Sequence, residues 1–155
     1  MNRLKVLFVC LGNICRSPLA EGVFRKFAQQ AGVSDRFEVD SAGTSSYHVG
    51  ESPHPGARHI AAQHGISLDG GYARRITPDD LERFDWLIAM DRSNAEALVR
   101  LDPAVRDKVR LLLDFADVGE KDVHDPYYDG SFEWTYRQIE AGCRGLLDHL
   151  RQQRR

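Results

Sequence analysis

A short apolar run near the start of the chain constrains the fold more than any other feature. Residues 4–9, "LKVLFV", are almost continuously apolar and include β-branched and aromatic side chains, which is typical of a strand buried on both faces of a sheet. Three later segments also predict strands: 37–43 ("FEVDSAG"), 85–90 ("DWLIAM") and 109–115 ("VRLLLDF"). The sequence therefore predicts a sheet of four strands.

The segments between these strands have the pattern of helices. Ser17 and Pro18 are predicted to open a helix, as N-cap and first helical residue. Residues 54–65 predict a second helix, closed by a glycine, and residues 91–101 a third. The last helix has an apolar stripe with steps of three and four residues. Strands that alternate with helices predict an α/β fold: one doubly wound domain over residues 1–155, with a four-stranded parallel sheet and helices on both faces. The stripe consists of Phe132, Tyr136, Ile139, Cys143, Leu146 and Leu150.

Composition and charge narrow the function classes. Hydrophobic residues make up 42% of the chain and charged residues 28%, so a packed core is expected. The formal net charge of −2 argues against a general binder of nucleic acids or membrane surfaces. No apolar stretch approaches the roughly 18 residues of a membrane span. We expect a cytoplasmic protein with neither nucleic acid nor membrane as a partner, and with its three cysteines kept as thiols.

The loop after the first strand, "VCLGNICRSP" at residues 9–18, predicts an oxyanion site. Ligands of α/β folds bind at the carboxyl ends of the strands. Gly12 and Asn13 can adopt positive φ, which turns backbone N–H groups inward as an anion nest. The helix dipole adds positive charge at the same place, and Arg16 offers a planar fork for phosphate oxygens. The loop is therefore suited to phosphate or another tetrahedral oxyanion.

Cys10 lies at the base of this loop. A free thiol titrates near pH ~8.5, and a helix N-terminus or a nearby cation lowers that value. A thiolate there can attack bound phosphorus and form a cysteinyl-phosphate. Buried apolar cysteines are the alternative for Cys10 and Cys15, but Cys-x5-Arg-Ser between a strand and a helix is far more specific. The loop lacks the lysine of a P-loop NTPase, and its cysteine spacing does not suit zinc, so we expect neither metal nor cofactor.

These residues resemble the low-molecular-weight protein tyrosine phosphatase family. The loop resembles the family's C-x5-R-S signature, and "HDPYYDG" at residues 124–130 resembles its Asp-Pro-Tyr segment. The spacing between the two segments and the chain length also match. The resemblance implies Cys10 as nucleophile, Arg16 as phosphate clamp and Asp125 as general acid and base. It implies a phosphotyrosine-containing protein as the partner, with a tyrosine kinase as one candidate.

The resemblance also implies supporting and substrate-binding residues. Ser17 would stabilise the Cys10 thiolate, and Asn13 would hold the loop geometry. Tyr47 and Tyr127 would form aromatic walls of the cleft, against which a phosphotyrosine ring can stack; ordinary surface tyrosines are the alternative. The substrate-binding set is Leu11, Gly12, Asn13, Ile14, Cys15, Ser17, Tyr47 and Tyr127.

Asp125 also has a physical argument of its own. Phosphoryl transfer to a cysteine expels an alkoxide or phenolate, which needs a proton, and no residue of the loop is suited to donate one. Pro126 biases Asp125 toward an extended conformation. A simple Asp-Pro turn before the last helix is the alternative.

Three other residues have more modest interpretations. Cys143 is predicted to be a core residue, and Asp91 a helix cap or a partner of the loop. The family often has a histidine at the position of Gly71, where it supports the serine and asparagine of the loop.

We also expect peroxide to form a Cys10–Cys15 disulfide, because a curled loop can bring two Cα atoms within about 7 Å. Simple packing of Cys15 below the loop is the alternative.

Three rival functions remain. A thioredoxin-coupled arsenate reductase would need a further cysteine pair, and only Cys143 is left. By resemblance, protein-arginine phosphatases favour a threonine where this chain has Ile14. A catalytically inactive phosphate-binding module is disfavoured by the intact Cys10, Arg16 and Asp125.

Overall fold

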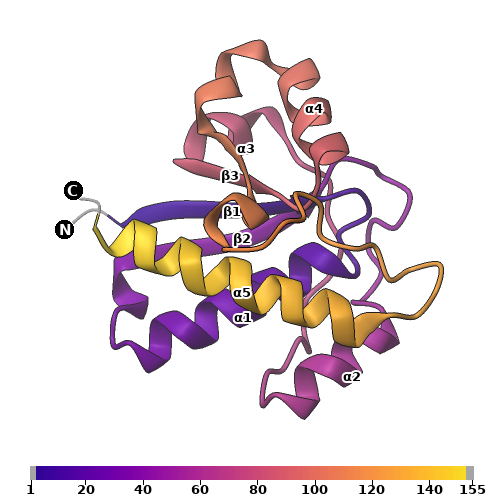
Figure 1. The fold of residues 1–155 in the computed structure, drawn as a ribbon. Helices are drawn as coiled ribbons and strands as arrows, with labels where there is room; N and C mark the ends of the chain where they lie inside the picture. The colour runs from indigo at the N-terminus through magenta and orange to yellow at the C-terminus, as the bar shows by residue number, and fades with distance from the viewer. Residues whose placement is uncertain (1–2, 153–155) are drawn as a thin grey trace.

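A parallel sheet lies at the centre of the fold (Figure 1). We describe a computed structural model that covers residues 3–152. Within that range the sheet has four strands, all parallel, in the order β2-β1-β3-β4. The predicted α/β class and the four-stranded parallel sheet are thus confirmed. The strands are β1 (Leu4–Cys10), β2 (Phe37–Gly43), β3 (Trp86–Ala89) and β4 (Val109–Leu111).

The strand order places the carboxyl end of β1 at a special position. Val6 of β1 pairs with Val39 of β2 on one side and with Trp86 of β3 on the other. After β1 the chain forms β2 on one side of β1, and it later crosses to the other side to form β3. This reversal is the topological switch point at which open α/β sheets bind ligands, and the loop at residues 9–18 begins there.

Helices cover both faces of the sheet, as predicted. In Figure 1, α1 and α5 lie side by side on one face, and α3 and α4 lie on the other. The bounds are α1 (Arg16–Gln30), α2 (Pro55–Gln63), α3 (Pro78–Arg83), α4 (Arg92–Leu101) and α5 (Phe132–Arg151); short 3-10 helices occupy Ser34–Arg36, Pro103–Lys108 and Leu112–Phe115.

The alternation of side chains along β1 separates two apolar clusters. Val6 and Phe8 face α1 and α5, whereas Leu7 and Val9 face the opposite cluster, and all four are fully buried. A strand buried on both faces has this continuous apolar pattern because neither side meets water.

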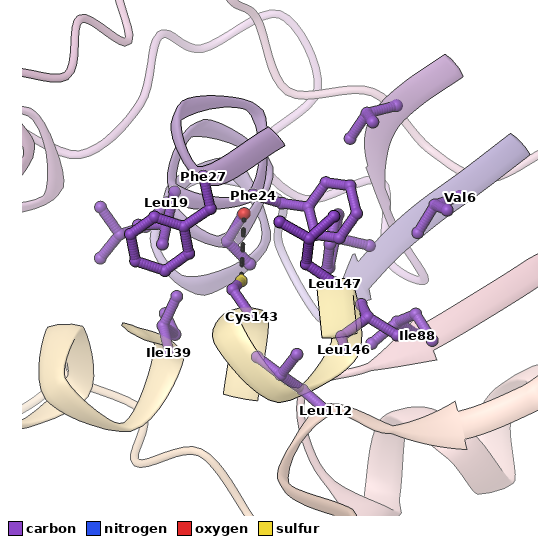
Figure 2. Close-up of a cluster of buried hydrophobic side chains, with 14 of the residues drawn as sticks. Val6, Leu19, Phe24, Phe27, Ile88, Leu112, Ile139, Cys143, Leu146 and Leu147 are labelled. Atoms are coloured by element: carbon purple, nitrogen blue, oxygen red, sulfur yellow. Dashed lines mark hydrogen bonds between the residues drawn. The ribbon is translucent and has the colours of Figure 1, made fainter. Parts of the chain in front are cut away.

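Cys143 belongs to the first cluster, as predicted. Figure 2 shows its Sγ among Phe24, Leu146 and their neighbours, within 3.5 Å of the Ala20 carbonyl oxygen. Complete burial raises the pKa of this thiol well above its ordinary range. Cys143 is therefore an unreactive core residue.

The predicted helices at 54–65 and 91–101 are confirmed as α2 and α4. Gly65 has a φ of +74° just beyond α2, as a closing glycine should. Asp91 is the N-cap of α4, and its Oδ1 accepts from the Asn94 N–H at 2.7 Å. The short helix α3 was not predicted, although its start has a capping box from Thr77 to Asp80.

Two predicted element ends are wrong. α1 begins at Arg16 with Cys15 as its N-cap, so Ser17 is not the cap; its hydroxyl contacts the Cys10 thiol instead. The fourth strand ends at Leu111 rather than at residue 115. Leu112 turns into a 3-10 helix and packs against α5 at Gly142, where a Cβ would lie 2.5 Å from its Cγ. An apolar run alone does not distinguish a strand from a buried helical turn.

Candidate active site

The loop between β1 and α1 places Cys10 at its base. The Cys10 Sγ is 3.2 Å from the Asn13 backbone nitrogen and 2.9 Å from the Ser17 Oγ. The N–H donates to the sulfur, and the hydroxyl can do so too. Hydrogen bonds donated to a thiolate favour its charged form, and the N-terminus of α1 adds positive potential. The site therefore suits a thiolate.

Asn13 holds the shape of this loop. It has a φ of +58°, which costs an asparagine less than other non-glycine residues. Its Nδ2 donates to the Ser17 Oγ at 2.8 Å and to the Ser41 Oγ at 3.1 Å, and its Oδ1 accepts from the Arg74 N–H at 3.0 Å. Gly12 does not have the positive φ that we expected as one option.

Gly12 is instead required by a close approach. A Cβ on Gly12 would lie 2.8 Å from the Cδ2 of His48, a separation that real Cβ atoms do not reach. The imidazole therefore rests against the backbone of the loop. A larger residue at this position would push His48 away from the site.

Arg16 is almost completely buried, with 4% of its surface exposed. Its NH1 donates to the Asp91 Oδ2 at 2.8 Å and to the Val123 carbonyl at 2.9 Å. Burial opposes its charge, but Cys10, Asp91 and Asp125 outweigh this and raise the pKa of the guanidinium above its ordinary value. Asp91 is thus both a helix cap and a partner of Arg16, so both parts of its prediction hold.

Asp125 reaches the same place from a different part of the chain. Its Oδ2 lies 3.7 Å from the Arg16 NH2, and its side chain is 36% exposed. The other carboxylate oxygen accepts from the Tyr127 N–H at 3.1 Å, which closes an Asx turn around Pro126. Asp125 therefore faces the loop while its carboxylate remains open to a ligand.

A cavity of about 360 Å³ opens between the loop, Asp125 and a wall of aromatic rings. The His48 ring lies 4.7 Å from that of Tyr47 and 5.7 Å from that of Tyr127, centroid to centroid. Every predicted site residue except Asn13 and Ser17 lines the cavity, and these two are buried within the loop. The lining residues are Cys10, Leu11, Gly12, Ile14, Cys15, Arg16, Ser45, Tyr47, His48, Asp125, Tyr127 and Tyr128.

The model of one protein family, described as "Low molecular weight phosphotyrosine protein phosphatase", matches residues 5–155. The chain belongs to this family. YfkJ of Bacillus subtilis, named a low molecular weight protein-tyrosine-phosphatase, is 41% identical over 97% of this chain and 98% of its own. The crystal structure of YfkJ superposes with a TM-score of 0.96 and covers 100% of this chain and 99% of YfkJ.

Two other phosphatases in solved structures are also similar. A protein tyrosine phosphatase of Entamoeba histolytica, crystallised with Hepes in its active site, is 34% identical with a TM-score of 0.91, and the match covers 96% of this chain and 97% of that one. A Drosophila arginine phosphatase is 32% identical with a TM-score of 0.88, over 97% and 100% of the two chains.

Ser41 and Glu21 form a support beneath the loop. The Ser41 hydroxyl accepts from Asn13 and donates to the Glu21 Oε1 at 2.7 Å. At Gly71, where we expected relatives often to have a histidine, a Cβ would contact only the Leu68 carbonyl, at 3.5 Å, and Gly71 borders a cavity of about 330 Å³. Neither Ser41 nor Glu21 was predicted as a site residue, because these contacts join segments that are far apart in the sequence.

The second cysteine of the loop has a different environment. Burial, with contributions from Cys10 and Asp125, raises the pKa of the Cys15 thiol to about 12. Cys15 therefore stays protonated near neutral pH, unlike the Cys10 nucleophile that the loop suits. Ile14 and Cys15 form a small apolar cluster with Ala73, against which Phe132 packs.

Two absences apply to residues 3–152 of the phosphatase. In that range, no group of three or more His, Cys, Asp or Glu side chains is arranged to hold a metal ion. None of the helices in the same range has the length and apolar character needed to span a membrane.

Proposed function

We propose that this chain hydrolyses phosphotyrosine in proteins through a cysteinyl-phosphate intermediate. The observation that supports this most directly is the convergence of three side chains on one cavity: Cys10 and Arg16 from the loop at residues 9–18, and Asp125 from a segment far along the chain. Cys10 is the proposed nucleophile, Arg16 the phosphate clamp, and Asp125 the general acid and base. Each step follows from chemistry that these three side chains can supply.

In the first step, the Cys10 thiolate attacks phosphorus in line with the leaving oxygen. An S–P bond forms, the P–O bond to the tyrosine ring breaks, and Asp125 gives its proton to the departing phenolate. Arg16 and the N–H groups at the start of α1 hold the equatorial oxygens, whose charge is spread in the transition state. Ser17 stabilises the thiolate as the attacking and later as the leaving group.

In the second step, water attacks the phosphocysteine. Asp125 is now ionised and takes a proton from that water as a general base. The S–P bond breaks, inorganic phosphate forms, and the Cys10 thiolate is regenerated. Proton and charge thus balance over the cycle with no metal or cofactor.

The aromatic side chains around the cavity favour a substrate whose phosphate is attached to an aromatic ring on the surface of another protein. Tyr47, Tyr127 and Tyr128 all line the cavity, and they are 81%, 42% and 85% exposed. We propose that phosphate and other oxyanions bind in the loop while a cytoplasmic phosphoprotein, of which a tyrosine kinase is one candidate, covers the rim. An arsenate reductase is disfavoured because Cys143, the cysteine outside the loop, is fully buried.

Phosphotyrosine peptides should be hydrolysed with a kcat/KM roughly 10- to 100-fold above that of matched phosphoserine peptides. Burying one ring is worth about 1.5–3 kcal/mol, and about 1.4 kcal/mol corresponds to a factor of ten. Assays in EDTA should give the same rates. Tyr127→Ala should narrow the gap by about two- to tenfold. Equal kcat/KM values for both peptides, or faster release from phosphoarginine peptides, would refute the tyrosine assignment.

Peroxide should inactivate the enzyme by linking Cys10 to Cys15. Oxidation of the Cys10 thiolate to a sulfenic acid removes one of the charges that, after burial, raise the Cys15 pKa. The Cys15 sulfur then attacks the sulfenic sulfur, and the thiol proton leaves with the hydroxyl group as water. Phosphate should slow the reaction, and dithiothreitol should restore activity. Peptide mass mapping checks for the cross-link. Recovery by dithiothreitol without a Cys10–Cys15 peptide, or undiminished recovery in Cys15→Ser, would contradict the assignment.

A further inference from the structure

His124, which lies outside the cavity, forms a hydrogen bond across the turn that contains Asp125. The His124 Nε2 lies 2.8 Å from the Asp129 Oδ2, and the His124 ring stacks on Trp134 with centroids 4.8 Å apart and planes 20° apart. Trp134 belongs to α5, whereas His124 and Asp129 flank the Asp-Pro-Tyr-Tyr turn. The pair thus joins the two ends of the turn, and the indole supports it from one side.

The backbone of His124 is held as firmly as its ring. Its N–H donates to the Gln138 Oε1 at 2.7 Å, and its carbonyl accepts from the Thr135 hydroxyl at 2.9 Å. Both partners lie on α5. The far end of the turn is closed by the Asp129 Oδ1, which accepts from the Ser131 N–H at 3.0 Å. The peptide that leads into Asp125 is therefore fixed relative to α5 from several directions.

We propose that His124 is a positioning residue for the general acid: paired with Asp129 and stacked on Trp134, it holds the turn at residues 124–129 so that the Asp125 carboxyl faces the cavity. The inference rests on the proposed acid role of Asp125. His124 touches neither the cavity nor the reacting atoms, and it acts through the conformation of its neighbour. Small displacements of a reacting group cost rate steeply, so a modest restraint has a measurable effect.

The Asp129 carboxylate contributes to this restraint. Its pKa is lowered, first by the hydrogen bond from His124 and then by that from the Ser131 N–H. Since a lowered carboxyl pKa gives stabilisation that is lost as the pH falls through that value, the restraint should weaken at low pH.

Few other charges face the imidazole. The α5 residues that contact His124, namely Trp134, Thr135 and Gln138, are uncharged. Asp125 follows His124 in the chain, and the Arg16 guanidinium contacts the Val123 carbonyl on its other side. Asp122 is paired with Arg92. Asp129 is therefore the group that most directly couples the imidazole charge to the turn.

The kinetic test compares kcat/KM on phenyl phosphate, which needs a proton at its leaving group, with kcat/KM on p-nitrophenyl phosphate, which needs one less. Asp129→Asn removes the charge but retains an acceptor for the Ser131 N–H, and His124→Phe retains a ring over Trp134. Both variants should lower kcat/KM on phenyl phosphate by about two- to fivefold, the range expected for an exposed ion pair. The loss of kcat/KM on p-nitrophenyl phosphate should be smaller in both variants.

Glu133→Gln is the matched control. It breaks the exposed Glu133–Arg137 pair on the same helix and should leave both substrates unaffected. Equal losses on both substrates, or no loss, in Asp129→Asn and His124→Phe would overturn the proposal. If Asp125→Asn still lowers kcat/KM on phenyl phosphate more than on p-nitrophenyl phosphate, such a result refutes only the role of His124. If Asp125→Asn lowers both values equally, the proposed acid role of Asp125 is refuted as well.

Discussion

Cys10→Ser should abolish turnover while inorganic phosphate still binds. A serine hydroxyl has no base beside it in this loop, and its oxygen stays protonated where a thiolate would be charged. Loss of a covalent nucleophile commonly costs about 10⁴- to 10⁶-fold in kcat, and we expect at least the lower figure. The oxyanion contacts from Arg16 and the N-terminus of α1 are unaffected, so calorimetry should still detect phosphate.

Two comparisons make this result specific. Cys10→Ala, which has no nucleophilic atom, should be as inactive as Cys10→Ser, and both should unfold near the temperature of the parent protein. Rapid quenching of the parent enzyme with a ³²P-labelled substrate should trap phosphate on the peptide that contains Cys10. A serine variant that retains more than about a hundredth of the parent activity would show that catalysis by a cysteine nucleophile is the wrong mechanism.

Asp125→Asn should lower kcat/KM on phenyl phosphate by about 10²- to 10⁴-fold. An amide cannot give its proton to the departing phenolate, although it still fits the turn and can accept from the Tyr127 N–H. Activated aryl phosphates have a leaving group that is a weaker base, so their kcat/KM should fall much less in this variant. Asp122→Asn is the matched control, because Asp122 lies in the same segment but pairs with Arg92 away from the cavity.

The pH profile gives an independent check on Asp125. The first step needs an ionised nucleophile and a protonated general acid, so kcat/KM of the parent enzyme should have a bell-shaped dependence on pH, with an alkaline limb that reports loss of the acid's proton. Asparagine does not titrate, so this alkaline limb should flatten in Asp125→Asn. If the alkaline limb keeps its shape in Asp125→Asn, a group other than Asp125 is responsible for it.

Much of the fold follows from local patterns. β1 was recognisable because a strand covered on both faces must be apolar at nearly every position, and α5 because its apolar stripe repeats at helical steps. Element ends were less predictable. Ser17 looked like an N-cap, since serine favours that position, but its hydroxyl contacts a thiol that only the folded loop brings near. The run at residues 109–115 divided into strand and 3-10 helix where α5 packs against it.

The groups that share the short loop could be recognised from the sequence. Cys10, Asn13 and Arg16 are so close in the chain that a strand end and a helix start leave them few arrangements. The surroundings of these residues depend on the folding of the whole chain. Asp91, Asp125 and Ser41 come from distant segments, and neither the place of His48 against the loop nor the contacts of His124 with α5 could be inferred from sequence spacing. Their distances depend on how strands pair and how α5 packs, because such long-range contacts arise from the burial of whole faces rather than from any residue spacing.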